Sequence, residues 1–93
     1  MDRTIVRLII RGRVQGVGYR WWTLQQARRL RLDGWVRNRL DGTVELLAAG
    51  AAGAVEQLIE ACGRGPDAAA VSAVERLEAE EDPPPGFDER RTV

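Results

Sequence analysis

A glycine-rich segment followed by an arginine is the part of the sequence best suited to bind an anion. It reads GRVQGVGYR over residues 12–20, between a strand-like run and a helix-like run. Glycine allows positive φ, so successive backbone N–H groups can point at one spot beside a helix N-terminus. The planar guanidinium of Arg20 can bind a phosphoryl group bidentately. These features predict a cradle for one phosphoryl group. A plain strand-to-helix turn, with Arg20 solvated or paired with an acidic neighbour, explains the loop pattern equally well.

The same loop does not match the common nucleotide-binding loops. It lacks the Gly-Lys-Ser/Thr ending of a Walker loop, and its glycines have the wrong spacing for a dinucleotide fingerprint. A nucleotide site is therefore not expected.

Asn38 is the second residue with a chemical role to consider. It lies in the segment GWVRNRLDGTVE, residues 34–45, near the expected end of a strand and just before an Asp-Gly turn. An asparagine there commonly ends a strand by hydrogen bonding to nearby backbone. For Asn38 taken alone, this structural interpretation is favoured.

Composition excludes several other chemistries. The chain has no histidine and one cysteine, so it cannot form a Ser-His-Asp or Cys-His arrangement, an ordinary zinc site or an internal disulfide. Cys62 lies in an apolar helical pattern, which favours a buried structural thiol. The 14 basic residues, all arginine, balance 14 acidic residues, and this makes general nucleic-acid binding unfavourable.

Periodicity predicts how these residues are positioned. Alternation and turn signals predict strands, and three-to-four spacing predicts helices. The expected order is strand 4–10, helix 19–32, strand 35–39, strand 43–49, a helix around 55–62, strand 71–80 with a bulge, and a short edge strand 87–91 after a rigid linker at 82–86.

This order predicts one α+β domain over residues 1–93, a ferredoxin-like two-layer sandwich with βαββαβ topology. The sheet is expected to be antiparallel, with both helices on one face and solvent on the other. The sequence has neither a signal peptide nor an apolar run of about 20 residues. We therefore expect a cytoplasmic protein with no membrane partner.

The two site segments, taken together, resemble the acylphosphatase family. The resemblance rests on GRVQGV with Tyr19-Arg20 and on GWVRN with DGTVE, and it extends over almost the whole chain to Gly86-Phe87. It implies that Arg20 and Asn38 are catalytic. It further implies that backbone groups of Gln15, Gly16, Val17, Gly18, Tyr19 and Arg20 bind phosphate. Thr43 matches a position where the family often carries threonine. A supporting role at the site is possible, but an ordinary structural role within the strand is favoured.

The resemblance implies a small-molecule acyl phosphate substrate, with no cofactor, no metal and no nucleic-acid partner; a monomer is expected. The leaving group is a carboxylate, which needs little acid catalysis, and this suits a protein without histidine. Asn38 would then position a water, and a phosphate oxygen of the substrate would accept its proton.

Three positions depart from the family's usual pattern. Arg31 replaces a glycine at the end of the first helix, where a left-handed conformation is expected. Glu89 replaces an apolar residue in the last strand, and Trp22 replaces a residue that is more often phenylalanine.

Two alternatives stay open at this point. Ferredoxin-like domains also bind RNA or carry metal ions, but RNA binders of this shape present aromatic residues on the central strands. Acylphosphatase-like domains also form the N-terminal part of hydrogenase-maturation carbamoyltransferases, and a fragment of such a chain would carry the same segments.

Overall fold

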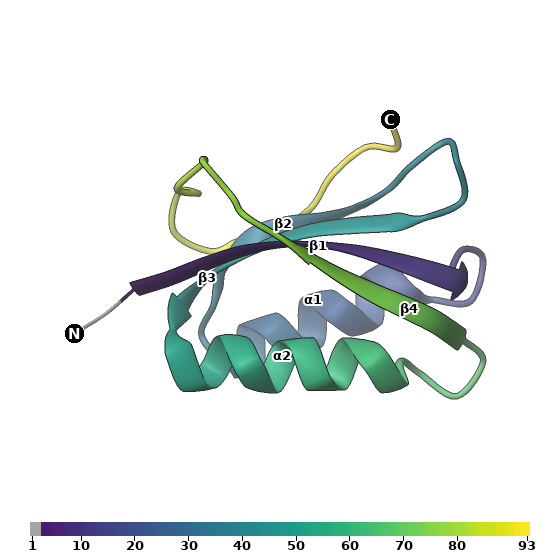
Figure 1. Cartoon of the computed structure of the whole chain (residues 1–93), viewed down its shortest axis with the longest axis horizontal. Helices are drawn as coiled ribbons and strands as arrows, with labels where there is room; N and C mark the ends of the chain where they lie inside the picture. The colour runs from purple at the N-terminus through teal and green to yellow at the C-terminus, as the bar shows by residue number, and fades with distance from the viewer. Residues whose placement is uncertain (1–2) are drawn as a thin grey trace.

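The first strand is an interior strand of the sheet, with a neighbour on each side. The structure is a computed structural model that describes residues 3–93. Strand β1 (Arg3–Arg13) pairs antiparallel with β3 (Val44–Ala51) on one side and with β4 (Ala70–Leu77) on the other. Strand β2 (Asp33–Asn38) pairs antiparallel with β3, and β5 (Phe87–Glu89) lies outside β2. The sheet order is β4-β1-β3-β2-β5 (Figure 1).

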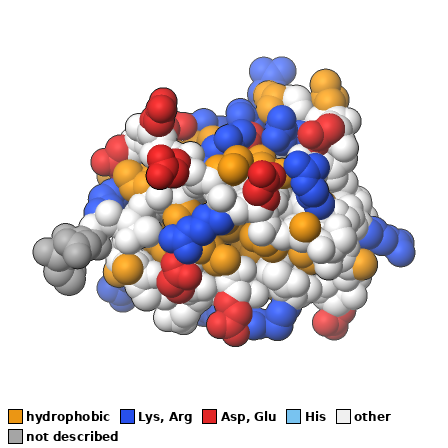
Figure 2. Space-filling model, in the orientation of Figure 1, with side chains coloured by type: hydrophobic (Ala, Val, Ile, Leu, Met, Phe, Trp, Pro, Cys, Tyr) orange, Lys and Arg blue, Asp and Glu red, His pale blue; other side chains and the backbone are white. Residues whose placement is uncertain are grey.

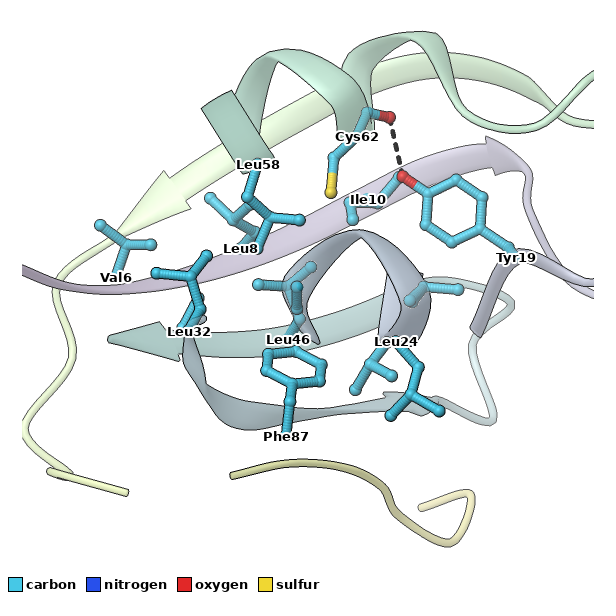
Figure 3. Packing of buried hydrophobic residues seen from close by; sticks show 14 of the residues in the cluster. Val6, Leu8, Ile10, Tyr19, Leu24, Leu32, Leu46, Leu58, Cys62 and Phe87 are labelled. Carbon is cyan, nitrogen blue, oxygen red and sulfur yellow. Dashed lines mark hydrogen bonds between the residues drawn. The ribbon is translucent and has the colours of Figure 1, made fainter. Parts of the chain in front are cut away.

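Both helices cover the same face of this sheet (Figure 1). Helix α1 (Tyr19–Arg29) connects β1 to β2, and α2 (Ala52–Arg64) connects β3 to β4. The alternating apolar side chains of the strands meet the apolar faces of the helices and form one core (Figure 3). The ferredoxin-like α+β sandwich expected from the sequence is thus confirmed.

The last strand gives the sheet a mixed character. Gly34, Trp35 and Val36 of β2 pair in parallel with Phe87, Asp88 and Glu89, whereas every other strand pair is antiparallel. Phe87 is buried in the core, and its carbonyl accepts hydrogen bonds from Arg28 of α1 at 3.1 and 3.2 Å. These contacts fix β5 at the edge, as expected, and bring Glu89 toward the start of α1.

The helix-free face is less solvated than the sequence suggested. Ile9, Trp35 and Leu47 are buried there, although they lie outside the helix-covered core. The chain between β4 and β5 loops back on this side of the sheet (Figure 1), and residues 78–81 line a cavity with Trp35. The guanidinium of Arg90 lies 4.8 Å from the Trp35 ring centroid. The expectation of a solvated face is therefore wrong for the middle of the sheet.

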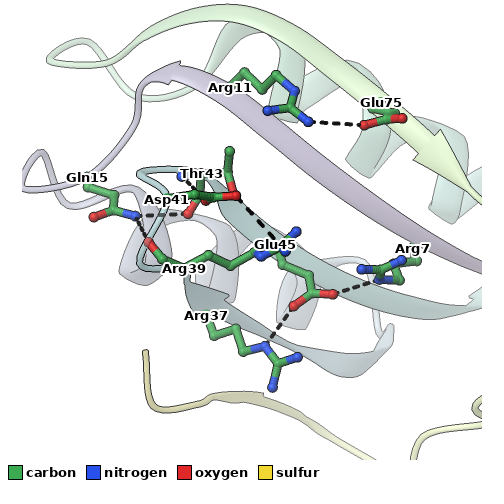
Figure 4. A network of polar contacts seen from close by, with 9 residues as sticks. All are labelled: Arg7, Arg11, Gln15, Arg37, Arg39, Asp41, Thr43, Glu45 and Glu75. Carbon is green, nitrogen blue, oxygen red and sulfur yellow. Dashed lines mark hydrogen bonds and ion pairs between the residues drawn. The ribbon is translucent and has the colours of Figure 1, made fainter. Parts of the chain in front are cut away.

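A buried carboxylate on this face is neutralised by arginines. Glu45 accepts hydrogen bonds from Arg7 at 2.6 Å and Arg37 at 2.7 Å (Figure 4). Burial by itself would raise the pKa of Glu45, but these two hydrogen bonds and the arginine charges outweigh it and lower that pKa. Arg7, one of the arginines that alternate with isoleucine along β1, is therefore the ion-pair partner of Glu45 on the neighbouring strand β3.

Two local irregularities predicted from the sequence are present. Arg11 pairs with Ala73 and Gly12 with Val71, so Ser72 is the extra residue of a bulge in β4. Arg31 adopts a left-handed conformation with φ of 57°.

The end of α1 shows why Arg31 takes this conformation. The N–H of Arg31 donates to Arg28 O and that of Leu32 donates to Ala27 O, each at 3.0 Å. This is the hydrogen-bond pattern of a Schellman motif.

Candidate active site

The loop between β1 and α1 has the conformation that its glycines require. Gly16 has φ of 73° and Gly18 has φ of 77°, and a Cβ at either position would contact nothing within 4 Å. Glycine is therefore needed for the backbone conformation rather than for space. Gly18 is the N-cap of α1, and no acidic residue follows in the first turn. The positive end of the helix dipole is thus left without a carboxylate from its own first turn.

Tyr19 anchors this end of α1 to the second helix. Its side chain is 1 % exposed, and its hydroxyl donates a hydrogen bond of 2.7 Å to the carbonyl of Cys62 in α2 (Figure 3). Burial raises the pKa of Tyr19 well above its usual range. The ring also packs against Trp22, with 5.5 Å between ring centroids. This contact fixes the backbone from which the next residue, Arg20, projects.

Arg20 lies in the first turn of α1 and is partly exposed. Its Nη1 atom lies 3.4 Å from Oε2 of Glu89, and the two side chains are 34 % and 41 % exposed. The acidic partner comes from β5, which is far away in the sequence. The ion pair uses one nitrogen of the guanidinium, so other N–H donors of Arg20 are left for a second anion.

Asn38 is the last residue of β2 and faces the same place. Its Oδ1 atom is buried and has no hydrogen-bond partner among the described residues. The backbone carbonyl of Asn38 accepts a hydrogen bond of 3.2 Å from the N–H of Val93. The strand end is thus held by backbone contacts, and the side-chain amide is not needed to terminate the strand.

A cavity of about 150 Å³ brings these residues together. Its walls come from the loop, the first turn of α1 and the ends of β2 and β5. The lining residues are Val14, Gly16, Gly18, Tyr19, Arg20, Trp21, Asn38 and Glu89. Arg20, Asn38 and part of the predicted loop therefore meet at one cavity, whereas the side chains of Gln15 and Val17 point elsewhere. Val17 packs against the core.

Gln15 holds the loop against the β2–β3 hairpin. Its Nε2 atom donates to the carbonyls of Arg39 at 2.8 Å and Thr43 at 2.9 Å (Figure 4). Thr43 is itself fixed by the turn, because its N–H and hydroxyl both donate to Oδ1 of Asp41. These two hydrogen bonds lower the pKa of Asp41, and the one from the Thr43 hydroxyl has the larger effect. Gln15 and Thr43 thus set the distance between the loop and the strand that carries Asn38.

Three lining residues, Val14, Trp21 and Glu89, are not among the site residues named from the sequence. Glu89 was marked only as an unusual residue in the last strand, and Trp21 is 63 % exposed at the rim.

A larger cavity of about 480 Å³ lies on the helix-free face and contains Glu45. None of its lining residues belongs to the loop or to a helix start, so the smaller cavity is the better candidate. Within residues 3–93, no group of three or more Cys, Asp or Glu is arranged to hold a metal ion. The helices of the same residues include none that is long and apolar enough to cross a membrane.

Comparison with known proteins gives a consistent result. A family model for acylphosphatase matches residues 6–89. An acylphosphatase from Acidiphilium cryptum is 56 % identical over 85 residues, which cover 91 % of this chain and 93 % of that protein. An acylphosphatase structure from Coxiella burnetii has a TM-score of 0.90 at 36 % identity, covering 96 % of this chain and 94 % of that one. The acylphosphatase structure from Bacillus subtilis has a TM-score of 0.88 at 34 % identity, covering 96 % and 99 %.

Proposed function

Because the chain belongs to the acylphosphatase family, we propose that it hydrolyses acyl phosphates to a carboxylate and inorganic phosphate. The observation that carries this proposal is the meeting of Arg20, the glycine loop and the unpartnered Oδ1 of Asn38 at one cavity. An arginine and a helix start can bind the phosphoryl group. The amide oxygen can then hold the attacking water.

The phosphoryl group is held by Arg20 and by backbone N–H groups of residues 15–20. The donors of Arg20 that Glu89 does not engage bind phosphoryl oxygens, and the N–H groups at the start of α1 bind the others. Phosphoryl transfer requires mainly positioning and stabilisation of charge on the equatorial oxygens. These fixed donors supply that stabilisation without reorganisation.

Asn38 positions the water. Its Oδ1 atom accepts a hydrogen bond from the water, which directs a lone pair of the water oxygen toward phosphorus. A bond forms between this oxygen and phosphorus, and the bond from phosphorus to the acyl oxygen breaks. The electron pair leaves with the carboxylate. Since an amide cannot act as a base, the proton of the water passes to a phosphoryl oxygen.

We also propose that no metal, cofactor or nucleic acid takes part. The positive charge required at the phosphoryl group comes from Arg20 and the helix start. On the face shown in Figure 2, basic and acidic side chains are interspersed and form no continuous basic surface. In this proposal the substrate is a small-molecule acyl phosphate, and the protein acts as a monomer.

Hydrolysis of benzoyl phosphate, followed by ultraviolet absorbance in the presence of EDTA, tests this function. We expect rapid turnover by the wild type. Asn38→Ala should lose about 10²–10³-fold in kcat while phosphate still inhibits competitively, since the phosphate donors are intact. Gln25→Ala, a change at an exposed position of α1, is the matched control and should behave as wild type. A folded wild type without turnover, or full activity in Asn38→Ala, would contradict the proposal.

A further inference from the structure

Glu89 is the one carboxylate that lines the candidate site. It lies on β5 opposite Val36 in the parallel register, and Val36 precedes Asn38 by two residues on the same strand face. The Glu89 side chain therefore points toward the cavity beside Asn38 and contacts Arg20 at 3.4 Å. Asp88, the preceding residue, pairs with Trp35 and projects from the opposite face.

We propose that Glu89 acts as an internal counter-anion of Arg20 and lowers the affinity of the site for phosphoryl groups, including the released phosphate. This proposal rests on the function proposed above. Arg20 is the only cation and Glu89 the only anion among the residues that line the cavity, so their formal charges cancel. A ligand anion therefore meets a site in which a carboxylate already engages its cation.

The geometry places the two anions close together. A phosphoryl oxygen bound to the guanidinium lies about 2.9 Å from a nitrogen of that group. Glu89 Oε2 lies 3.4 Å from Nη1 of the same guanidinium. The carboxylate oxygen and the phosphoryl oxygen are then at most about 6–8 Å apart. This distance does not exceed the Debye screening length, which is roughly 8 Å at physiological salt. Because both side chains are partly exposed, water weakens the repulsion but does not remove it.

This repulsion acts on ground state and transition state to a similar extent. The phosphoryl group is negatively charged in the substrate, in the transition state and in the product. A uniform change in binding alters KM and leaves kcat nearly unchanged. Repulsion also scales with ligand charge, so a dianion is affected about twice as strongly, in free energy, as a monoanion of the same shape.

A different role for the same contact predicts the opposite sign. If Glu89 orients Arg20, its removal would loosen the guanidinium, weaken anion binding and lower kcat. The two roles are therefore separated by the direction of the change in affinity.

The test is Glu89→Gln, which keeps the shape and a hydrogen-bond acceptor and removes the charge. Calorimetric titration at low ionic strength would measure binding of inorganic phosphate, sulfate and methanesulfonate. We expect phosphate and sulfate to bind about three- to tenfold more tightly than in the wild type, with a smaller gain for methanesulfonate. KM for benzoyl phosphate should fall by a similar factor. Asp88→Asn, which changes the net charge equally from the other face of the strand, should show none of these shifts.

Weaker phosphate binding or a large loss of kcat in Glu89→Gln would overturn the proposal in favour of an orienting role. Unchanged anion binding, or an equal change in Asp88→Asn, would overturn it as well. The titrations need no turnover. A wild type that fails to hydrolyse benzoyl phosphate, but whose sulfate affinity rises in Glu89→Gln, would contradict the proposed reaction and leave the counter-anion role supported.

Discussion

In the proposed function Arg20 engages two anions at the candidate site, and this makes the shape of its side chain as important as its charge. One nitrogen faces Glu89 at 3.4 Å, and the rest of the planar group is available for a phosphoryl group. Lysine carries the same charge on a single nitrogen and cannot engage both partners in the same geometry. We predict that Arg20→Lys lowers kcat/KM for benzoyl phosphate by about 10²–10³-fold, measured by the ultraviolet assay.

The matched control for this substitution is Arg64→Lys. Arg64 lies at the exposed end of α2, where it pairs with Glu60, and it does not line the cavity. Its substitution should leave kcat/KM within about twofold, since exposed ion pairs contribute little. Comparable activity in Arg20→Lys and wild type would show that charge alone is sufficient.

The residues of the site differ in how far the sequence could predict them. Arg20 and the loop lie in one short segment, so their proximity follows from local chain geometry. Asn38 required a strand end to be placed beside the loop, which the resemblance implied and the structure provides. Glu89 could not be placed, because its contact depends on three residues of β5 pairing in parallel with β2. No periodicity in so short a strand indicates its direction or its neighbour.

The backbone is strained just after the C-terminus of α1, at Arg31. Arg31 holds φ of 57°, a conformation that costs a non-glycine residue about 1–2 kcal/mol. Its side chain is exposed, and the Schellman motif is built from backbone groups that glycine would keep. We predict that Arg31→Gly raises the free energy of unfolding by about 0.5–1 kcal/mol after the entropy cost of glycine. Thermal unfolding should show a melting temperature higher by about 2–8 °C.

Arg29→Gly provides the comparison within the same helix. Arg29 is the last residue of α1, is exposed, and has ordinary helical conformation. Glycine there should lower the free energy of unfolding by about 1 kcal/mol. If both variants were destabilised equally, relief of the left-handed conformation would not be the dominant effect at Arg31.

The elements themselves were largely predictable, and the exceptions share a cause. Strands and helices with clear period-two or three-to-four spacing appear where they were expected. The helix-free face was expected to be solvated because Arg and Ile alternate along β1. Trp35 there lies beside residues 78–81 and Arg90, which are distant from it in sequence. Local patterns do not contain that information.

At the scale of the whole molecule, one buried contact joins the site to the core. Tyr19 begins the helix that carries Arg20, and its hydroxyl is bonded to the carbonyl of Cys62 in α2. The thiol of Cys62 is fully buried, and burial raises its pKa to about 12. Ionisation of this thiol is therefore coupled to unfolding of the domain, because the thiolate forms readily only when the helix leaves the core.

The sign of this coupling predicts an alkaline loss of stability. In the unfolded chain the thiol ionises near pH 8.5, whereas in the folded chain it stays protonated up to about pH 12. Between these values the unfolded state binds fewer protons, so the free energy of unfolding falls as pH rises, by about 1.4 kcal/mol at pH 9.5. Below pH 8 the stabilisation is fully present.

Cys62→Ala removes this titration and keeps a small apolar side chain. We expect it to cost about 1–2 kcal/mol at pH 7 through lost packing, but to flatten the dependence on pH between 8 and 9.5. Urea unfolding at several pH values, followed by tryptophan fluorescence, measures both quantities. The N-terminal amine titrates in both proteins, and Tyr19 contributes only above about pH 10, so the difference in slope isolates Cys62. Parallel curves would show that the thiol is not protected by folding.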